Sequence, residues 1–377
     1  MASIWEQETF YKPQDVLIIG SGFTGLWSAL HLKKRNPRLK ITLVDRGIIP
    51  TGASTRNAGF ACFGSLTELM ADEQKSGTDR MLELVTMRFK GLQQIRSFSG
   101  ARQIDMDMPG GFELFGPQEQ RLREDLEHQV QYLNRLLKEA LGRKRVYRLC
   151  DNRDIRSFGF SQVEFLIRNH LEGYLHPGKL VRLLMQQLQQ AGVQFLFNTE
   201  VRSFSASGSR IILESNLPVE LSARQLLICT NGFARQLLPD LDVQPARGQV
   251  LVTSPIENLT WKGTFHYEEG FYYFRNLGHR VLLGGARNKA LQEETTYSLE
   301  TSASIQDELE RFLREIILPG REFSITHRWS GTMGVGAEKM PVLKEVSPGV
   351  LCCVRMSGMG VALAPELGKE NARRLLA

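Results

Sequence analysis

The strongest constraint on the fold is a short apolar run, residues 15–19, that leads directly into a glycine-rich turn at 20–25. The run contains β-branched residues and predicts a buried strand. Residues 26–34 predict a helix that stops near Asn36, and residues 41–44 predict a second buried strand. Together they form a strand–helix–strand unit of about thirty residues, the size of a parallel crossover. The chain is therefore expected to be an α/β protein with a parallel sheet.

The glycines of this turn follow the spacing G-x-G-x-x-G. Gly20 permits the tight turn, Gly22 lets a pyrophosphate approach the backbone, and Gly25 lets the helix pack closely on the strand. The N-terminus of the helix offers free N–H groups and a positive dipole to phosphates. Asp45 ends the second strand, where its carboxylate would accept hydrogen bonds from ribose hydroxyls and would repel a 2′-phosphate. The unit therefore predicts a dinucleotide other than NADP.

The next segment, TGASTRNAGF at 51–60, is rich in small and hydroxyl residues. Nicotinamide enzymes of the Rossmann type have no general need for such a segment, which favours FAD as the dinucleotide. We expect Ser54 and Arg56 near the pyrophosphate and the backbone of 57–59 near the isoalloxazine. Glycine makes up 34 of the 377 residues, and much of it lies in this segment, in the first turn and in later glycine pairs.

The rest of the chain alternates between α/β, helical and antiparallel patterns. This predicts a Rossmann-like FAD-binding domain and a discontinuous antiparallel-sheet α+β substrate domain. The predicted domain ranges are 12–78, 150–240 and 330–377 for FAD binding, and 79–149 and 241–329 for the substrate. The further predicted strands are 112–115, 193–197, 225–229, 249–253, 271–275, 280–284 and 350–354, and the further predicted helices are 81–98, 118–141, 177–192, 300–317 and 364–377.

Composition excludes several classes of protein. The net charge of +6 is spread along the chain, and the basic cluster at 143–148 is expected to be a solvated face, so no nucleic acid partner is expected. The five cysteines form no C-x-x-C pair, which predicts buried reduced thiols, no metal site and a reducing cytoplasmic location. The longest apolar stretch, 16–30, contains three glycines and is too short for a transmembrane segment.

As a set, these motifs resemble the D-amino acid oxidase family of FAD-dependent oxidoreductases, and its amine-oxidising branch in particular. The resemblance runs over nearly the whole chain. It is carried by GSGFTG at 20–25, DR at 45–46, GASTRNAG at 52–59, HPGKL at 176–180, CTNG at 229–232, PARGQ at 245–249, LGGAR at 283–287, WSG at 329–331 and SGMGVALAP at 357–365.

The resemblance implies a set of residues that contact a non-covalently bound FAD. Val201 is expected to end a strand near the adenine, and the backbone of 358–361 is expected near the pyrimidine side of the flavin. The full set is Gly20, Gly22, Phe23, Thr24, Gly25, Asp45, Arg46, Ser54, Thr55, Arg56, Asn57, Ala58, Gly59, Phe60, Val201, Thr230, Asn231, Gly232, Gly331, Gly358, Met359, Gly360 and Val361.

Departures from the family's pattern concern the substrate. An arginine that binds the substrate carboxylate in the amino-acid oxidases falls at Met333, and a second falls on or near Gly358. A tyrosine of the catalytic site falls close to Phe271, next to Tyr272 and Tyr273, and a histidine of the amine-oxidising branch falls at Met359. These departures disfavour a simple α-amino acid and favour a secondary amine, a polyamine derivative or another bulky amine.

Three arginines remain as candidates for a carboxylate anchor or for structural ion pairs, namely Arg275, Arg287 and Arg355. No catalytic dyad is recognisable in the sequence, so no catalytic residue is assigned.

The leading hypothesis is an FAD-dependent oxidoreductase that removes hydride from the carbon beside an amine nitrogen, with hydrolysis of the resulting imine. Flavin-dependent oxidation of a hydroxy acid or of a tRNA-linked amine is the alternative within the same fold. A non-catalytic nucleotide-binding protein is the alternative from another class. The electron acceptor is either oxygen or a carrier, and the sequence assigns no oligomeric state.

Overall fold

The computed structural model describes residues 2–98 and 100–377, and it divides into two compact units. The first unit contains the described residues up to Asn57, together with Pro177–Ala246 and Thr332–Ala377. The second contains Ala58–His176 and Arg247–Gly331. Each unit has its own large sheet and its own apolar core.

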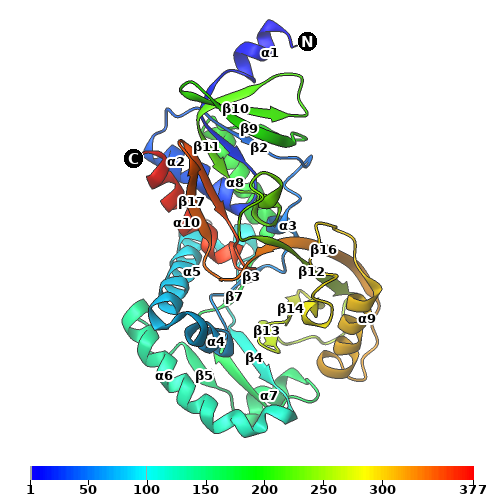
Figure 1. Ribbon diagram of the computed structural model, residues 1–377. Helices are drawn as coiled ribbons and strands as arrows, with labels where there is room; N and C mark the ends of the chain where they lie inside the picture. The colour runs from blue at the N-terminus through cyan, green and yellow to red at the C-terminus, as the bar shows by residue number, and fades with distance from the viewer. Residues whose placement is uncertain (1, 99) are drawn as a thin grey trace. The chain divides into compact units, whose positions relative to one another are not determined.

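The first unit is built on a mostly parallel sheet (Figure 1). Its main strand order is β17-β18-β11-β1-β2-β8, and β9 and β10 form an antiparallel extension that joins β11. The strands are β1 (Gln14–Ile19), β2 (Ile41–Val44), β8 (Gln194–Leu196), β9 (Val201–Ser207), β10 (Arg210–Ser215), β11 (Leu221–Ile228), β17 (Val342–Ser347) and β18 (Val350–Val354). The parallel pairing of β1 with β2 and β11 confirms the predicted crossover unit.

Helices of the first unit are α1 (Ile4–Thr9), α2 (Phe23–Arg35), α3 (Ala53–Arg56), α8 (Pro177–Gln190) and α10 (Gly360–Leu375). Figure 1 shows α2 and α10 side by side, and the two helices pack together closely. Gly368 permits this packing, because a Cβ there would lie 2.6 Å from the backbone carbon of Trp27. The N-termini of α2 and α10 follow the carboxyl ends of the parallel strands β1 and β18, the edge at which open α/β sheets bind ligands.

The second unit contains a mixed sheet in the order β16-β12-β15-β14-β13-β4-β6-β5. Its strands are β4 (Gly111–Phe115), β5 (Tyr147–Leu149), β6 (Phe165–Asn169), β12 (Gln244–Thr253), β13 (Thr264–Tyr267), β14 (Tyr272–Leu277), β15 (Arg280–Gly285) and β16 (Ile325–Val335). Residues 244–246 of β12 and 332–335 of β16 belong to the first unit. A small two-stranded sheet pairs β3 (Phe60–Ala61) with β7 (Gly173–Tyr174). One face of the large sheet carries an aromatic core that includes Phe265, Phe274 and Phe312.

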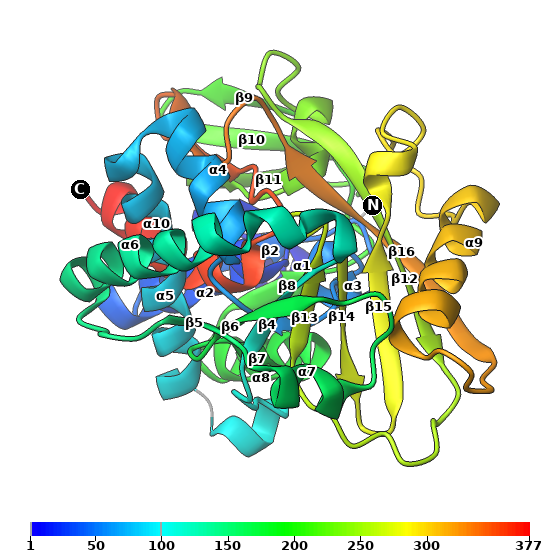
Figure 2. The same cartoon turned by 90° about the horizontal axis from the view of Figure 1, so that it is seen from below.

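Helices of the second unit are α4 (Leu66–Ser76), α5 (Thr78–Phe98), α6 (Arg123–Leu141), α7 (Asn152–Phe158) and α9 (Ala303–Phe312). Figure 2 shows α9, in orange, beside β15, and the two elements are in contact. Helices α4, α5 and α6 contact one another as a separate group. No helix among the described residues combines the length and the apolar character that crossing a bilayer requires.

Most predicted elements are confirmed, but several boundaries differ. The predicted helix 118–141 starts as a 3-10 helix over Pro117–Leu122, and the predicted helix 300–317 starts at Ala303 and ends in a π-helical turn. The C-terminal helix starts at Gly360 rather than at residue 364, and Pro365 lies inside it. The elements that were not predicted are the strands β3, β5, β6, β7, β9, β10, β13, β16 and β17 and the helices α1, α3, α4 and α7. Most of them are short, and a short run carries a weak periodic signal.

The two units also differ from the predicted domain ranges. Residues 58–78 and 150–176 belong to the second unit, although the sequence analysis assigned them to the FAD-binding domain. The physical reason is strand pairing: β6 pairs with β4 over five residue pairs, and β3 pairs with β7. The roles of the two units in binding FAD and substrate stay predictions.

Candidate functional site

The glycine-rich turn between β1 and α2 is shaped by close backbone approaches. A Cβ on Gly25 would lie 2.0 Å from the carbonyl oxygen of Gly20, and Gly20 itself has a φ of +104°. Gly22 is the N-cap of α2 and provides no side-chain cap. Of the first-turn donors, Phe23 N–H donates to Ser54 Oγ at 2.8 Å. The helix therefore begins with a small-residue cradle of the kind that accepts a pyrophosphate.

Asp45 ties this cradle to the end of β2. Its Oδ2 accepts from Ser21 N at 2.9 Å and from Ser21 Oγ at 2.6 Å, and its Oδ1 accepts from Gly47 N at 2.9 Å. A carboxylate has about four acceptor positions, so this arrangement leaves capacity for a ribose hydroxyl. The neighbouring Arg46 is exposed and stacks 3.8 Å from the centroid of the Phe233 ring.

The segment 51–57 folds back on itself beside the cradle. Thr55 Oγ1 donates to Pro50 O at 2.6 Å, and Arg56 Nε donates to Thr51 O at 2.9 Å. Asn57 Nδ2 donates to the carbonyl oxygens of Ala53 and Ser54. The structure thus brings Ser54 to the start of α2, while the side chains of Thr55, Arg56 and Asn57 hold the shape of the segment.

Ala58, Gly59 and Phe60 continue this segment in the second unit. Gly59 has a φ of +74°, and its carbonyl oxygen accepts from Leu175 N at 2.8 Å. Phe60 starts β3, and its ring meets the His266 and Tyr273 rings edge-on at 5.2 and 5.9 Å between centroids. The predicted flavin-contacting segment therefore leads onto the face of the large sheet that carries His266 and Tyr273.

Val201 does not end a strand, as predicted, but starts β9. The preceding strand, β8, ends at Leu196, and the chain then turns through Asn198 with a φ of +52°. Thr199 N donates to Asp45 O at 2.8 Å, which places this turn next to the ribose-binding candidate. Val201 thus lies at the start of a strand, and its contact with the adenine stays a prediction.

The last glycine motif lies in a strained loop between β18 and α10. Three of its residues have positive φ: Arg355 at 66°, Ser357 at 47° and Gly358 at 82°. Such strain concentrates at functional sites. Asn231 Oδ1 accepts from Met356 N at 3.1 Å, and Ser357 N donates to Gly334 O at 3.0 Å. The loop is therefore held by the CTNG motif and by β16.

Two buried hydroxyl groups at this loop are available to a ligand. Thr230 Oγ1 and Ser357 Oγ have no hydrogen-bond partner among the described residues. Met359 is the N-cap of α10 and offers no side-chain cap to the first turn at Gly360 and Val361. A ligand rich in acceptors, such as the pyrimidine side of a flavin, would satisfy these donors, so the residues present fit FAD.

Met333 occupies the position expected for a carboxylate-binding arginine. Its Sδ lies 3.5 Å from where a Cβ on Gly358 would be, so the two positions at which the family's pattern has an arginine lie close together. A Cβ on Gly232 would lie 2.5 Å from the Met333 carbonyl oxygen. These two positions offer a thioether sulfur and backbone groups, and neither provides a cationic side chain. Gly331 is buried in β16, and its contact with FAD stays a prediction.

In the second unit, the sheet face beside Phe60 is apolar with polar residues set into it. Tyr273 lies over Gly284, where a Cβ would come within 2.5 Å of the ring. Burial raises the pKa of Tyr273 to about 12 and lowers the pKa of His266 to about 4, so both side chains are neutral at neutral pH. The apolar part comprises Ala58, Phe60, Val250, Val252, Tyr273, Leu282 and Trp329.

Tyr272 faces the opposite side of the sheet and lies in the aromatic core. It is 1% exposed, stacks on Phe312 at 4.6 Å between centroids, and donates its hydroxyl to Glu308 Oε1 at 2.5 Å. Phe271 packs against the same aromatic core, and its carbonyl oxygen accepts from Ala286 N. Side chains alternate along a strand, so Tyr273 lies on the face with His266 and Tyr272 lies on the other face, whereas Phe271 precedes β14.

The three candidate arginines have different surroundings. Arg355 is committed to structure: it forms an ion pair with Asp242 and donates to Met340 O from Nε and Nη2 at 3.0 and 2.8 Å. Arg287 is half-buried, and its charge offsets part of the rise that burial causes in the pKa of Tyr273. Arg275 is 4% exposed and stacks 4.7 Å from the centroid of the Tyr174 ring. Arg275 and Arg287 therefore remain the candidates for binding an anion.

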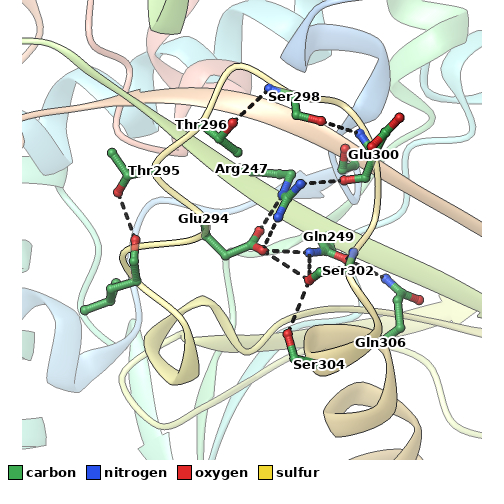
Figure 3. Close-up of polar contacts among 12 residues, drawn as sticks. Arg247, Gln249, Glu294, Thr295, Thr296, Ser298, Glu300, Ser302, Ser304 and Gln306 are labelled. Carbon is green, nitrogen blue, oxygen red and sulfur yellow. Dashed lines mark hydrogen bonds and ion pairs between the residues drawn. The ribbon is translucent and has the colours of Figure 1, made fainter.

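The PARGQ motif forms a buried polar network instead of a binding site (Figure 3). Arg247 donates to both oxygens of Glu294, from Nε at 2.9 Å and from Nη2 at 2.6 Å, and Gln249 Nε2 donates to the same carboxylate at 2.8 Å. Ser302 links the network to the start of α9. The network anchors the segment between Arg287 and α9 to β12.

Two buried carboxyl groups were missed by the sequence analysis. Glu113 accepts from Ser65 Oγ and from the backbone N–H and hydroxyl of Thr67, and burial raises its pKa to about 7. Glu172 accepts from the backbone N–H groups of Phe63 and Gly64, and burial raises its pKa to about 8. Both tie the chain after β3 to the large sheet.

The sequence analysis also did not predict that Thr264 lies beside Arg275 and His266 beside Tyr273. The alternation of Thr264 and His266 with the core residue Phe265 carries a strand signal, T-F-H, that places both polar residues on one face. Nothing in the sequence pairs this strand with β14 or β4, and that pairing creates the face.

The chain matches the family model DAO, described as FAD dependent oxidoreductase, over residues 15–374, and it belongs to this family. It is therefore an FAD-dependent oxidoreductase. All five cysteines are buried and free, as predicted.

Among curated proteins, the chain is 27% identical over 376 residues to a probable oxidoreductase OrdL of Rhizobium meliloti, covering 97% of this chain and 83% of that protein. It is 23% identical over 377 residues to the gamma-glutamylputrescine oxidoreductase of Escherichia coli, covering 96% and 83%. Both alignments span nearly the whole chain.

Solved structures show the same fold. The L-proline dehydrogenase from P. horikoshii matches with a TM-score of 0.77 at 16% identity, covering 96% of this chain and 93% of that one. The glycine oxidase from Geobacillus kaustophilus matches with a TM-score of 0.76 at 18% identity, covering 96% and 95%. At these identities the likeness concerns the fold alone.

Proposed function

We propose that this oxidoreductase oxidises the C–N bond of an amine, acting on a CH–NH or CH–NH₂ group, and releases an imine that water hydrolyses. When bound, FAD supplies the acceptor for the hydride at its N5 atom. The single observation that carries the proposal is that Tyr273 and His266, which lie beside an apolar cluster, are both neutral at neutral pH in a chain of this family.

The residues of this face suit a neutral amine. The apolar cluster around Val250 and Leu282 excludes water from the reacting end of a substrate. His266 and Tyr273 are neutral at neutral pH, so neither supplies an ionised base. Orientation of a deprotonated amine against the flavin then provides the rate acceleration, and the rate is expected to rise with pH through the pKa of the substrate's own ammonium group.

Met333 favours an amine over a simple α-amino acid. With methionine at this position, this residue contributes no guanidinium for a carboxylate attached to the reacting carbon. The activities named for two similar proteins, gamma-glutamylputrescine oxidoreductase and glycine oxidase, support a nitrogen-containing substrate.

We further propose that FAD is bound without a covalent link, by the residues predicted above. The support is the cradle at Gly22 and Ser54, the placement of Asp45, and the unsatisfied hydroxyls of Thr230 and Ser357. Burial raises the pKa of Cys62 well above its ordinary value, which disfavours the thiolate that a thioether link would need. Acid precipitation should release the flavin into the supernatant.

Anaerobic reduction of the flavin tests the proposed reaction. The purified holoenzyme is mixed with a panel of primary and secondary amines and with hydroxy acids, and the loss of visible flavin absorbance is recorded. Bleaching by an amine supports the proposal, whereas bleaching by hydroxy acids alone refutes it. A colourless protein that takes up no FAD would point to a non-catalytic nucleotide-binding role.

The electron acceptor is proposed to be either oxygen or a carrier, and reoxidation of the bleached enzyme in air separates the two. The five free buried cysteines support a cytoplasmic location.

A further inference from the structure

Three polar atoms on one sheet face of the second unit have no hydrogen-bond partner. These atoms are Arg275 Nε, Thr264 Oγ1 and His266 Nε2, all buried and unpartnered among the described residues. In the register of β13 and β14, Thr264 lies opposite Arg275, and His266 lies opposite Tyr273. Side chains alternate across a sheet, so these four residues share one face. The unsatisfied atoms therefore form a cluster.

Arg275 is the most unusual member of this cluster. It is 4% exposed, and within the described parts of the chain it makes no ion pair and no side-chain hydrogen bond. Burial lowers its pKa to about 10, which still leaves it charged at neutral pH. Stacking on the Tyr174 ring compensates only part of the lost hydration. An arginine that is buried and retains its charge calls for an anion to complete its surroundings.

The nearby carboxyl groups do not provide that anion. Glu113 lies opposite His266 on β4, but it accepts hydrogen bonds from Ser65 and Thr67. Glu172 lies over Gly111 and accepts from the backbone N–H groups of 63 and 64. Burial raises the pKa of Glu113 to about 7 and that of Glu172 to about 8, so at neutral pH Glu113 is about half protonated and Glu172 mostly protonated, which weakens their repulsion of an incoming anion. Asp105 acts on Arg275 only through its field, without an ion pair.

We propose that Arg275, with Thr264 beside it, binds a carboxylate of the substrate, so that the amine carries an anionic group several bonds away from the oxidised C–N bond. This inference rests on the proposed function. The guanidinium would donate to both carboxylate oxygens, and the Thr264 hydroxyl would donate a further hydrogen bond. Arg275 lies two residues from Tyr273 along β14, which is about 7 Å. Tyr273 contacts Phe60, the predicted flavin neighbour. The carboxylate of the substrate would therefore lie about this two-residue distance from the C–N bond that is oxidised.

Binding of a small carboxylate to the oxidised holoenzyme tests the subsite without turnover. The probe is valerate, the control ligand is its uncharged amide valeramide, and the readouts are the flavin spectrum and the thermal unfolding temperature. Valerate is expected to perturb the spectrum saturably and to raise the unfolding temperature by about 2–4 °C, with no effect of valeramide. Arg275→Met is expected to weaken valerate binding by about tenfold or more, and Thr264→Val by about threefold. Arg328→Met, which removes a guanidinium bound to Gln306 and Glu310, should leave valerate binding unchanged.

Turnover provides the second test, with δ-aminovalerate and n-pentylamine as a matched pair of amines. The wild-type enzyme should have a kcat/KM for δ-aminovalerate that exceeds the value for n-pentylamine by about tenfold, and Arg275→Met should abolish the difference through KM. The ligand-free Arg275→Met protein should unfold at an equal or higher temperature, because the substitution removes an unpaired buried charge. A structural role for Arg275 would instead lower that temperature.

Three results would overturn the subsite. They are equal affinity for valerate and valeramide, an Arg275→Met protein that keeps the preference for the carboxylate, or loss of that preference in Arg287→Met alone. The proposed function fails separately: if valerate binds through Arg275 but no amine bleaches the flavin, the anion subsite stands and the amine chemistry is wrong. If amines bleach the flavin with no dependence on a carboxylate, the chemistry stands and the subsite is wrong.

Discussion

The buried ion pair between Arg247 and Glu294 should be the most sensitive polar contact of the second unit. Arg247 is 7% exposed and Glu294 is 1% exposed, and two direct hydrogen bonds join them. Glu294→Gln keeps the shape of the side chain and leaves Arg247 as a buried charge without its partner. Breaking such a pair costs about 3–5 kcal/mol. Arg247 Nη1 also donates to Glu300 O at 2.8 Å, so the guanidinium keeps one acceptor in the variant. The expected loss in the free energy of unfolding is therefore at the lower end of this range, about 3 kcal/mol.

Urea-induced unfolding of the holoenzyme, followed by far-UV circular dichroism, measures this loss. The matched control is Glu83→Gln, which removes an exposed partner of Arg80 and should cost less than about 0.5 kcal/mol. Replacing both members of the buried pair, as in Arg247→Met with Glu294→Leu, should recover most of the loss, because no buried charge is then left unpaired. If Glu294→Gln costs no more than Glu83→Gln, the network in Figure 3 does not depend on the charge of Glu294.

Three further substitutions test other parts of the structure. Gly25→Ala places a Cβ 2.0 Å from a carbonyl oxygen and should yield protein without visible flavin absorbance. The exposed control Gly100→Ala should keep its flavin. A yellow Gly25→Ala protein would contradict the role of the glycine turn in binding FAD. Glu172 holds its proton in the folded state up to about pH 8 but loses it near its ordinary pKa when unfolded, so the free energy of unfolding should fall by about 1–3 kcal/mol as pH rises through that interval. Glu172→Gln should flatten this dependence in urea titrations at several pH values, and an unchanged slope would contradict it. Tyr272→Phe removes one hydrogen bond to Glu308 and should cost about 1 kcal/mol with unchanged kcat/KM, so an activity loss would return Tyr272 to the substrate pocket.

Contiguous residues carried the information for the dinucleotide-binding unit. The turn at 20–25 needs glycine at three nearby positions because of local backbone geometry, and an apolar strand on each side of a helix predicts a parallel crossover. The family likeness follows from the same short motifs, so the class of enzyme and its cofactor were accessible before any tertiary structure.

The surroundings of the individual polar residues depended on strand pairing between distant parts of the chain. Sequence alone left Tyr272 and Tyr273 equivalent, but the direction of β14 turns one into the aromatic core and the other onto the opposite face. It also left Arg275 and Arg355 as equal candidates, and only folding brought Asp242 to Arg355.

The sequence by itself therefore determined the fold class, the FAD-binding motifs and the departures at Met333 and Met359, because each is encoded in a few neighbouring residues. The tertiary structure decided which polar groups are satisfied and which are left for a ligand. Hydrogen bonds and ion pairs join residues that are far apart in the chain, as Arg355 is from Asp242, and the unpartnered Arg275 is visible only once all those pairings are known.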